Sequence, residues 1–272
     1  MSAGRSTDES RLSQNVRVLG QLDMKIVIAG GAGRIGSRIA RALDDQGYSV
    51  VVASPRHGID ALTGLGLAEA FANADVVIDT MNLPAAVPYS EAEKFFGTAT
   101  TNLLRAGEAA GVKHHLLLSV VGVDRVNSHY FRGKQKQERL VRDHGGPFSI
   151  VRSTSVLEAL RDSVLTDPEL GAPRVPNLTL QPVAALDLAR VVARTIAAAP
   201  RHGLIEVAGP ETLPLPELAT RMMRATGDLR HVVVDHTAEY LGTVFEPGDT
   251  ALLPDLRVGS TSVDEWLVHL PA

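Results

Sequence analysis

The stretch that decides the fold runs from Met24 to Gly58 and reads MKIVIAGGAGRIGSRIARALDDQGYSVVVASPRHG. A short apolar run rich in β-branched residues breaks into glycines, a helical pattern follows, and a second apolar run begins after Gly47. β-Branched apolar runs favour buried strands, and apolar residues spaced three to four apart favour a helix. The stretch therefore predicts a strand, a glycine-rich turn, a helix and a second strand.

The glycines of this turn have the spacing of a dinucleotide-binding loop. Gly31, Gly33 and Gly36 fit the pattern G-x-G-x-x-G, and Gly30, Gly33 and Gly36 fit a looser G-x-x-G-x-x-G spacing. Such glycines allow a tight turn, a close approach of the backbone to a pyrophosphate and close packing of helix on strand. Amide groups at the helix start then face the phosphate charge. Because the glycines lie between a strand and a helix, we expect a bound nucleotide rather than an ordinary turn.

The end of the second predicted strand lacks an acidic residue. In many dinucleotide-binding proteins an acid about 20 residues after the loop contacts the ribose hydroxyl. Here that place holds Ser54, Pro55, Arg56 and His57. An acid would repel a 2′-phosphate, whereas an arginine offers it two parallel hydrogen bonds. Arg34, inside the glycine loop, could lie beside the same phosphate. The sequence therefore favours NADP over NAD, and two solvated surface arginines are the alternative.

Composition excludes several classes of protein and site. The 272 residues are 44% hydrophobic and 21% charged, as in soluble globular proteins, and a net charge of −4 gives no general attraction to nucleic acid or membranes. The absence of cysteine excludes disulfides, thiolate catalysis and cysteine metal sites, and no other cluster has metal-ligand spacing. No apolar run reaches the roughly 18 residues of a membrane span, and no signal peptide is evident. We expect a cytoplasmic monomer or homodimer that acts on a small molecule, with no metal.

The rest of the chain alternates strands and helices. Further strands are predicted at 75–82, 114–122 and 147–154, and helices at 65–74, 90–111 and 129–145. Ser90 followed by Glu93 has the pattern of a capping box, and 59–64 is a candidate for one more short strand. Such alternation predicts an α/β fold, a Rossmann-like doubly wound parallel sheet with helices on both faces.

The alternation divides the chain into three parts. Residues 1–23 are polar and read as a disordered extension, and residues 24–155 form the predicted NAD(P)-binding Rossmann core. Residues 156–272 are richer in proline and glycine and are expected to form a small C-terminal cap, with elements that return to the core. In this part Asp187 is interpreted as a helix N-cap. His114 and His115, at the start of a core strand, are interpreted as a solvated edge.

Tyr130 and Lys134 are the candidate catalytic pair, because residues four apart share one face of a helix. A phenol has a pKa near 10, which a neighbouring ammonium lowers. The same lysine could bind the nicotinamide ribose, and Asn102 could steady it through a water. Ser119 ends the preceding strand, at the sheet edge where ligands bind, and could hold a substrate carbonyl while Tyr130 transfers the proton. The alternative is a surface helix whose lysine reaches solvent.

Five segments carry a resemblance to a known superfamily: GGAGRIGSRIARAL, ADVVIDTMN, TTNLLRAGEAAGVKHHLLLSVVGVDR, YFRGKQKQERLVRDHGGPFSIVRST and QPVAALDLARVVA. Together they span residues 24–193, and they resemble the short-chain dehydrogenase/reductase superfamily in its atypical NmrA-like, NAD(P)H-binding branch. The resemblance implies a Rossmann core with a bound nicotinamide cofactor.

The resemblance also implies roles for individual residues. It gives Ser119, Tyr130 and Lys134 the catalytic positions, and it places Asn82 and Pro84 beside the cofactor. The complete predicted cofactor-binding set is Gly30, Gly33, Arg34, Ile35, Gly36, Ser54, Arg56, Asn82, Pro84 and Lys134. Members of this branch often lack a working tyrosine, and some only sense the redox state of the cofactor. Retention of Tyr130 and Lys134 favours an enzyme.

Three functions follow from these observations. The first is an oxidoreductase that transfers a hydride between NADP(H) and a small carbonyl or alcohol. The second is a sensor that binds NADP(H) and a partner protein without catalysis, and the third is an epimerase or isomerase with a bound cofactor. An enzyme should have an open pocket above Tyr130, whereas a sensor would fill that space with its own side chains.

Overall fold

A six-stranded parallel sheet lies at the centre of the protein. The structure is a computed structural model that describes residues 24–83, 88–165, 171–246, 249–250, 252–254 and 259–270. The sheet has the order β2-β1-β3-β4-β5-β8, and every neighbouring pair is parallel. Its strands are β1 (Lys25–Ala29), β2 (Ser49–Ala53), β3 (Val76–Asp79), β4 (His114–Val120), β5 (Phe148–Ser153) and β8 (Leu204–Val207). The predicted Rossmann-like α/β fold is confirmed.

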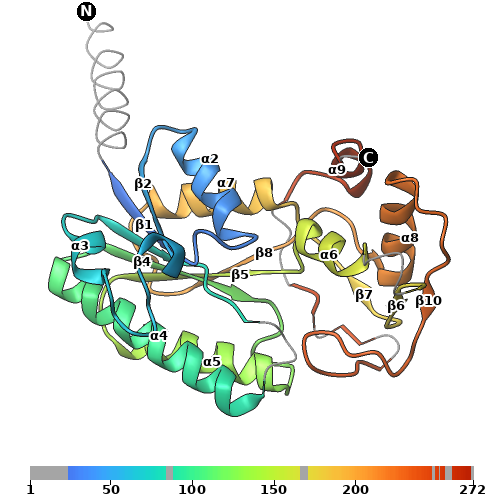
Figure 1. Ribbon diagram of the computed structural model, residues 1–272, viewed down its shortest axis with the longest axis horizontal. Coiled ribbons are helices and arrows are strands. Elements are labelled where there is room, and N and C mark those ends of the chain that lie inside the picture. Colours follow the sequence, from blue (N-terminus) through green and yellow to red (C-terminus); the bar gives the residue numbers. More distant parts are fainter. Residues whose placement is uncertain are drawn as a thin grey trace, which may run out of the picture.

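Helices cover both faces of this sheet (Figure 1). One face carries α2 (Gly36–Asp44) and α7 (Ala185–Ile196), and the other carries α3 (Leu67–Phe71), α4 (Tyr89–Ala110) and α5 (His129–Asp143). Alternate residues of β1 enter the two layers: Ile26 and Ile28 pack with α2 and α7, and Val27 packs with α3 and α4. Because both faces are covered, β1 is apolar from Ile26 to Ala29 rather than alternating.

The order of the strands places a crevice beside β1. From β1 the chain crosses first to β2 on one side and then to β3 on the other. Ligands of open α/β sheets bind at such a reversal, outside the carboxyl ends of the strands. The loop of residues 30–35, which joins β1 to α2, lies at this end.

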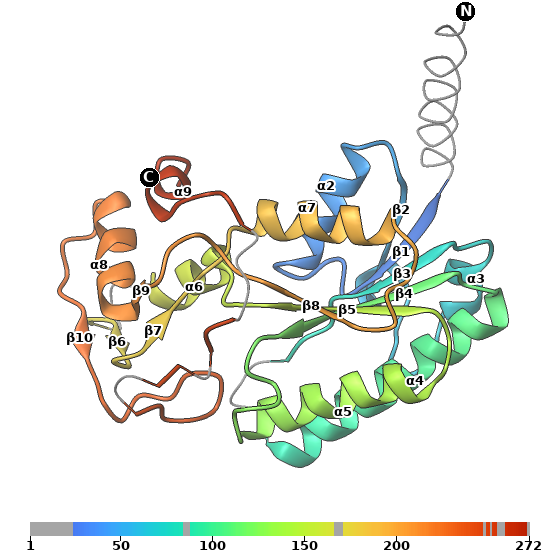
Figure 2. The ribbon, with the colours of Figure 1, turned by 180° about the vertical axis from the view of Figure 1, so that it is seen from behind.

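A second layered body, here called the cap, lies beside the carboxyl edge of the sheet (Figure 2). Its helices are α6 (Leu157–Val164), α8 (Leu215–Ala225) and α9 (Val263–Leu267). Two small sheets complete it, one of β6 (Arg174–Val175) with β10 (Val233–Val234) and one of β7 (Thr179–Leu180) with β9 (Leu213–Pro214). Leu160, Leu218, Met222 and Trp266 share its apolar core. The segment between α6 and α8 returns to the Rossmann sheet as α7 and β8.

Two local predictions are wrong because neighbouring backbone decides the structure. Helix α4 begins at Tyr89 with Pro88 in the N-cap position and no side-chain cap, so Ser90 lies inside the first turn. The segment 59–64 is a bend rather than a strand. Asn102 of α4 holds that bend by donating to the carbonyl oxygens of Ala61 and Leu62, at 2.8 and 3.1 Å. Its amide therefore fixes the bend instead of supporting Lys134.

Two further interpretations are overturned by long-range packing. His114 and His115 are 3% and 6% exposed, because β3 and β5 enclose β4 on both sides, so they are not a solvated edge. Asp187 does not cap α7, which begins at Ala185. Its carboxylate instead accepts backbone N–H groups of Ser260 and Thr261, at 2.9 and 2.8 Å, and so ties the last part of the chain to α7.

The described helices are all too short or too polar to cross a membrane. The extension predicted at 1–23 lies outside the described residues.

Candidate functional site

A cavity of about 870 Å³ opens at the carboxyl edge of the sheet, between the glycine loop and the cap. It brings together most of the residues predicted from the sequence. Those in its lining are Gly30, Gly33, Arg34, Ile35, Gly36, Ser54, Asn82, Ser119, Tyr130 and Lys134. Arg56 is exposed next to this lining but is not part of it, and Pro84 lies outside the described residues.

The glycines of the loop are required for two different reasons. Gly30 has a φ of +74°, and a Cβ there would lie 3.0 Å from the backbone nitrogen of Met81. A Cβ on Gly36 would overlap the carbonyl oxygen of Gly30. At Gly33 a Cβ would meet only that same oxygen, at 3.0 Å, and would otherwise project into open space. Gly30 and Gly36 are therefore needed for packing, whereas Gly33 keeps the cavity clear directly before the start of α2.

The end of β2 presents the hydroxyl of Ser54 and the ring of Pro55 to the cavity rather than a carboxylate. Ser54 and Pro55 line the cavity, and the Ser54 hydroxyl lies 2.7 Å from Nδ1 of His57. The acid in this part of the lining is Asp60, whose Oδ1 accepts the backbone N–H of Leu62 at 2.8 Å. That carboxylate is thus engaged with its own bend.

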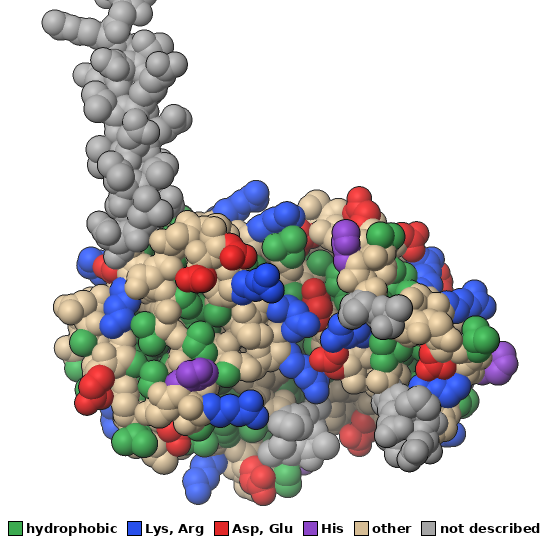
Figure 3. All heavy atoms as spheres, turned by 45° about the horizontal axis from the view of Figure 1, so that its top comes forward, with side chains coloured by type: hydrophobic (Ala, Val, Ile, Leu, Met, Phe, Trp, Pro, Cys, Tyr) green, Lys and Arg blue, Asp and Glu red, His purple; other side chains and the backbone are tan. Residues whose placement is uncertain are grey.

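Arg34 is the cationic side chain of the glycine loop. Its Nε lies 3.4 Å from a carboxylate oxygen of Asp162 on α6, and 66% of the arginine side chain is exposed. On the face shown in Figure 3, lysine and arginine side chains gather in the middle of the molecule, between the sheet and the cap. An exposed ion pair of this kind contributes little stability, so Arg34 can exchange its partner for another anion.

Tyr130 lies in the first turn of α5 with its ring buried and its hydroxyl hydrogen-bonded to the side chain of Asn82. Burial raises the pKa of Tyr130 to about 12, and the hydrogen bond from Asn82 opposes that rise. The predicted lowering of this pKa by Lys134 is therefore wrong. The phenol of Tyr130 is protonated at neutral pH and can act as a proton donor.

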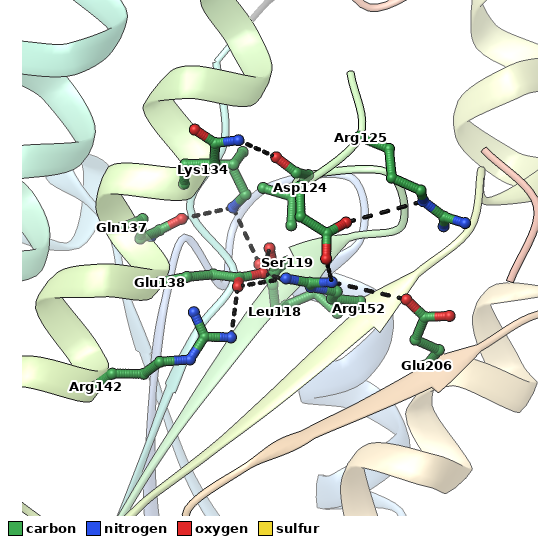
Figure 4. Close-up of polar contacts among 12 residues, drawn as sticks. Leu118, Ser119, Asp124, Arg125, Lys134, Gln137, Glu138, Arg142, Arg152 and Glu206 are labelled. Carbon is green, nitrogen blue, oxygen red and sulfur yellow. Dashed lines mark hydrogen bonds and ion pairs between the residues drawn. The ribbon is translucent and has the colours of Figure 1, made fainter. Parts of the chain in front are cut away.

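Lys134 is buried, and its ammonium is held by fixed acceptors (Figure 4). Its Nζ donates to Oε1 of Gln137 at 2.6 Å and to the carbonyl oxygen of Leu118 at 3.1 Å. The ring of Phe96 lies beneath it, with Nζ 4.9 Å from the ring centre. Burial lowers the pKa of Lys134 to about 8, and the charges of Asp79 and Glu138 oppose that fall. At neutral pH the side chain is thus mainly a cation.

Ser119 is the second-last residue of β4, but its hydroxyl is turned toward an ionic cluster under the cavity (Figure 4). It donates to Oε1 of Glu138 at 2.6 Å. Glu138 also accepts from both Nε and Nη2 of Arg152, at 2.8 and 2.9 Å, and from Arg142 at 2.9 Å. While this bond is in place, the Ser119 hydroxyl has no proton to give to a substrate carbonyl.

The cap contributes a second phenol to the cavity, which the sequence pattern does not predict. Tyr240 lines it together with Glu239 and Leu241, and its hydroxyl lies 2.5 Å from that of Ser155. Burial raises the pKa of Tyr240 to about 12, the hydrogen bond with Ser155 opposes the rise, and Tyr130 adds to it. The two phenols therefore lie close enough to influence each other. Residues 228–246 have no hydrophobic period that would have placed Tyr240 here.

The part of the chain that the structure describes contains no group of three histidine, aspartate or glutamate side chains arranged to hold a metal ion.

Solved structures with the same fold include several nucleotide-sugar epimerases. UDP-glucose 4-epimerase of Thermotoga maritima, solved with UDP-glucose, is 16% identical with a TM-score of 0.65, covering 78% of this chain and 85% of that one. The Thermus thermophilus UDP-glucose 4-epimerase, solved with NAD, is 18% identical with a TM-score of 0.65, covering 82% and 91%. UDP-glucuronic acid 4-epimerase of Bacillus cereus, also with NAD, is 17% identical with a TM-score of 0.65, covering 78% and 87%. At these identities the likeness shows the fold alone.

Sequence comparison gives the family. No curated protein sequence matches the chain. The model of the family described as NAD(P)H-binding matches residues 30–199, which contain the glycine loop, Tyr130, Lys134 and α7. This confirms the resemblance to short-chain dehydrogenases/reductases that the sequence segments predicted. The chain therefore belongs to the NAD(P)H-binding family.

Proposed function

We propose that this protein is an NADP(H)-dependent oxidoreductase of the NmrA-like type that reduces a small carbonyl compound. The observation that carries the proposal is the open cavity between the glycine loop and the cap, with Tyr130 in its wall. Its volume of about 870 Å³ is within the range of ligand sites, roughly 300–1,000 Å³. A sensor that fills the space above Tyr130 with its own side chains would lack such a cavity.

The residues at the sheet edge fit a dinucleotide. Gly33 leaves open the space before α2, where the amide groups of a helix start attract a pyrophosphate. When bound, the cofactor supplies the hydride. Lys134 has three N–H donors, and the described acceptors Gln137 and Leu118 take two of them, which leaves one for a ribose hydroxyl.

The choice of NADP rests on the charges near the end of β2. No carboxylate follows Ala53 directly, and the nearest acid of the lining, Asp60, is engaged by Leu62. Arg34 lies in the lining with 66% of its side chain exposed, and a 2′-phosphate can replace its ion-pair partner Asp162. Arg56, which follows Pro55 of the lining, adds a second positive charge. A 2′-phosphate is thus better matched here than an unphosphorylated ribose.

The protonated state of the Tyr130 phenol supports carbonyl reduction as the direction of the reaction. A phenol with a pKa of about 12 keeps its proton throughout the neutral range, which suits an acid that protonates a developing alkoxide. The opposite reaction would require a phenolate, which burial disfavours. We therefore assign Tyr130 as the proton donor in carbonyl reduction.

One observation favours a second candidate, a protein that binds NADP(H) without catalysis. The hydroxyl of Ser119 is committed to Glu138, so the predicted holder of the substrate carbonyl is engaged elsewhere. In the enzyme Tyr240 and Ser155 take that place. An epimerase of nucleotide sugars fits less well, because the described lining on the cap side contains Glu239 and no lysine or arginine for a diphosphate.

The test begins with cofactor binding and ends with turnover. NADPH and NADH are titrated calorimetrically, and a panel of aldehydes, ketones and quinones is then screened by NADPH absorbance. We expect NADPH to bind more tightly and at least one class of carbonyl to be reduced. Tyr130→Phe should retain NADPH affinity and lose about 10²–10⁴-fold in turnover. NADPH binding without turnover on the whole panel would favour the sensor, and absence of NADPH binding would refute both.

A further inference from the structure

Asp79, the last residue of β3, is a buried carboxylate with no part in the function proposed above. It is 0% exposed. Its Oδ1 accepts the backbone N–H of Met81 at 3.0 Å, and its Oδ2 accepts Nε2 of Gln137 at 2.8 Å. Gln137 is also 0% exposed, and its Oε1 accepts Nζ of Lys134 at 2.6 Å. A continuous series of hydrogen bonds therefore joins the end of β3 to the ammonium in the cavity wall.

The direction of these hydrogen bonds is fixed by their two ends. The Lys134 ammonium and the Met81 backbone N–H can only donate. Gln137 must then turn its oxygen to Lys134 and its amide nitrogen to position 79. A residue at position 79 must accept on both sides, which an ionised carboxylate does. An amide there would set one donor against another, whereas Asp79 in its ionised form accepts from both sides.

The other charges around Lys134 leave Asp79 as its main counter-ion. Glu138, on the same helix, is balanced by ion pairs with Arg152 and Arg142. On the side of α4, the uncharged ring of Phe96 lies beside the ammonium, with Nζ 4.9 Å from the ring centre. Among the described residues, the cation that acts on Asp79 is Lys134 itself.

Protonation of the two groups is consistent with this pairing. Burial raises the pKa of Asp79, and the charge of Lys134 with the hydrogen bonds from Met81 and Gln137 opposes that rise. Burial lowers the pKa of Lys134, which the charge of Asp79 opposes. Each ion therefore supports the charge of the other in a site where either alone would tend to become neutral.

We propose that Asp79 is a positioning residue of the cofactor site, which through Gln137 keeps the Lys134 ammonium charged and its remaining proton directed into the cavity. The part of this inference that concerns the cofactor rests on the proposed function. The same carboxylate holds the N–H of Met81, next to Asn82, and Asn82 is the hydrogen-bond partner of Tyr130. Asp79 thus fixes both of the side chains assigned to the reaction.

The experiment measures the titration of Lys134 directly. The side-chain carbons of lysine are labelled with ¹³C, and the Lys134 signal is identified by its loss in Lys134→Met. In the free protein we expect this signal to titrate near pH 8. In Asp79→Asn the titration should move down by roughly one pH unit or more, because an opposite charge is lost. Gln137→Leu, which keeps the size of the side chain and removes both hydrogen bonds, should move it in the same direction.

Asp75→Asn is the matched control. Asp75 directly precedes β3, at the opposite end of the strand, and accepts from Nζ of Lys113 at 2.7 Å and from the backbone N–H of Lys25 at 3.0 Å. The change removes a partly exposed carboxylate at the opposite end of β3, and the Lys134 titration should stay as in the wild type. If Asp79→Asn does not fold, the comparison of Gln137→Leu with Asp75→Asn carries the test.

NADPH binding is then measured as a function of pH in the same variants. The wild type should lose affinity above about pH 8, and in Asp79→Asn this loss should begin at a lower pH by the same interval as the NMR titration. A Lys134 signal that titrates alike in the wild type, Asp79→Asn and Gln137→Leu would overturn the inference. A shifted signal in a protein that binds no NADPH would instead leave the Asp79–Lys134 pairing intact and refute the proposed function.

Discussion

Replacement of Gly33 by valine should separate cofactor binding from stability. The backbone of Gly33 is outside the left-handed region, and within 4 Å its Cβ would meet a single atom, the carbonyl oxygen of Gly30 at 3.0 Å. That contact requires a shift of a few tenths of an ångström in an otherwise open position. The valine methyl groups would then occupy the space before α2 that a pyrophosphate needs.

The two effects differ in size. Replacing glycine lowers the conformational entropy of the unfolded chain, which stabilises the folded protein by about 0.4–1 kcal/mol. This gain offsets the cost of the tight contact, so the melting temperature should change by less than about 4 °C. Displacing a pyrophosphate forfeits at least one charge-assisted hydrogen bond, about 1.5–3 kcal/mol, so NADPH affinity should fall by roughly tenfold to a hundredfold or more.

Calorimetric titration with NADPH and thermal melting without it measure the two quantities. Gly203→Val is the control, because a Cβ there would meet only a carbonyl oxygen at 3.7 Å and lies far from the glycine loop in the sequence. Gly36→Ala should instead reduce stability. The new Cβ would overlap the backbone of Gly30, so the free energy of unfolding should fall by about 1–3 kcal/mol. Wild-type NADPH affinity in Gly33→Val would refute the assignment of the glycine loop.

Three further outcomes are expected. Arg56→Glu should weaken NADPH relative to NADH by roughly tenfold or more, because repulsion replaces a charge-assisted contact, and an unchanged ratio in calorimetry would exclude Arg56 from the phosphate site. Tyr240→Phe should raise KM for the carbonyl substrate with NADPH affinity unchanged, and steady-state kinetics with equal KM would remove Tyr240 from the substrate site. Burial lowers the pKa of His114 to about 4 and that of His115 to about 3, below the roughly 6.5 of an unfolded chain. Because the unfolded chain binds more protons between those values, stability should fall as pH drops below about 6.5, by up to about 1.4 kcal/mol per pH unit for each histidine. Urea unfolding between about pH 7 and 5 measures this loss, and His115→Phe should reduce it.

The fold could be predicted because its signals are local. The β-branched run of β1, the glycines after it and the helical period of α2 follow one another without interruption. The later strands each keep a run of apolar residues, such as Val76–Ile78 in β3 and Leu116–Leu118 in β4, because both faces of the sheet are covered, and that pattern can be recognised without knowing the packing partners. The position of α6 and the short strands of the cap were not predicted, because their apolar residues pack against segments distant in the sequence.

The site was predicted only as far as the backbone determines it. The topology brings Ser119, Tyr130 and Lys134 to one sheet edge, as expected from strand ends and helix spacing. The orientation of the polar side chains depends on hydrogen-bond partners that the spacing of residues in the sequence does not predict. Arg152 of β5 holds Glu138, which takes the Ser119 hydroxyl, and Asp79 with Gln137 takes the Lys134 ammonium.

The late return of the chain to its sheet has a consequence for synthesis on the ribosome. Strand β5 ends at Ser153, but its neighbour β8 is complete only at Val207, and α7, which covers Ile26, Ile28 and Ile39, lies between them in sequence. A nascent chain that has not reached Val207 has one edge of β5 without its hydrogen-bond partners, and before Ile196 an apolar face without its helix. Such a chain offers a template for pairing with its neighbours on the same messenger RNA. Chaperone binding should therefore be greatest on nascent chains whose emerged part ends between Ser153 and Val207, and should fall once β8 has emerged.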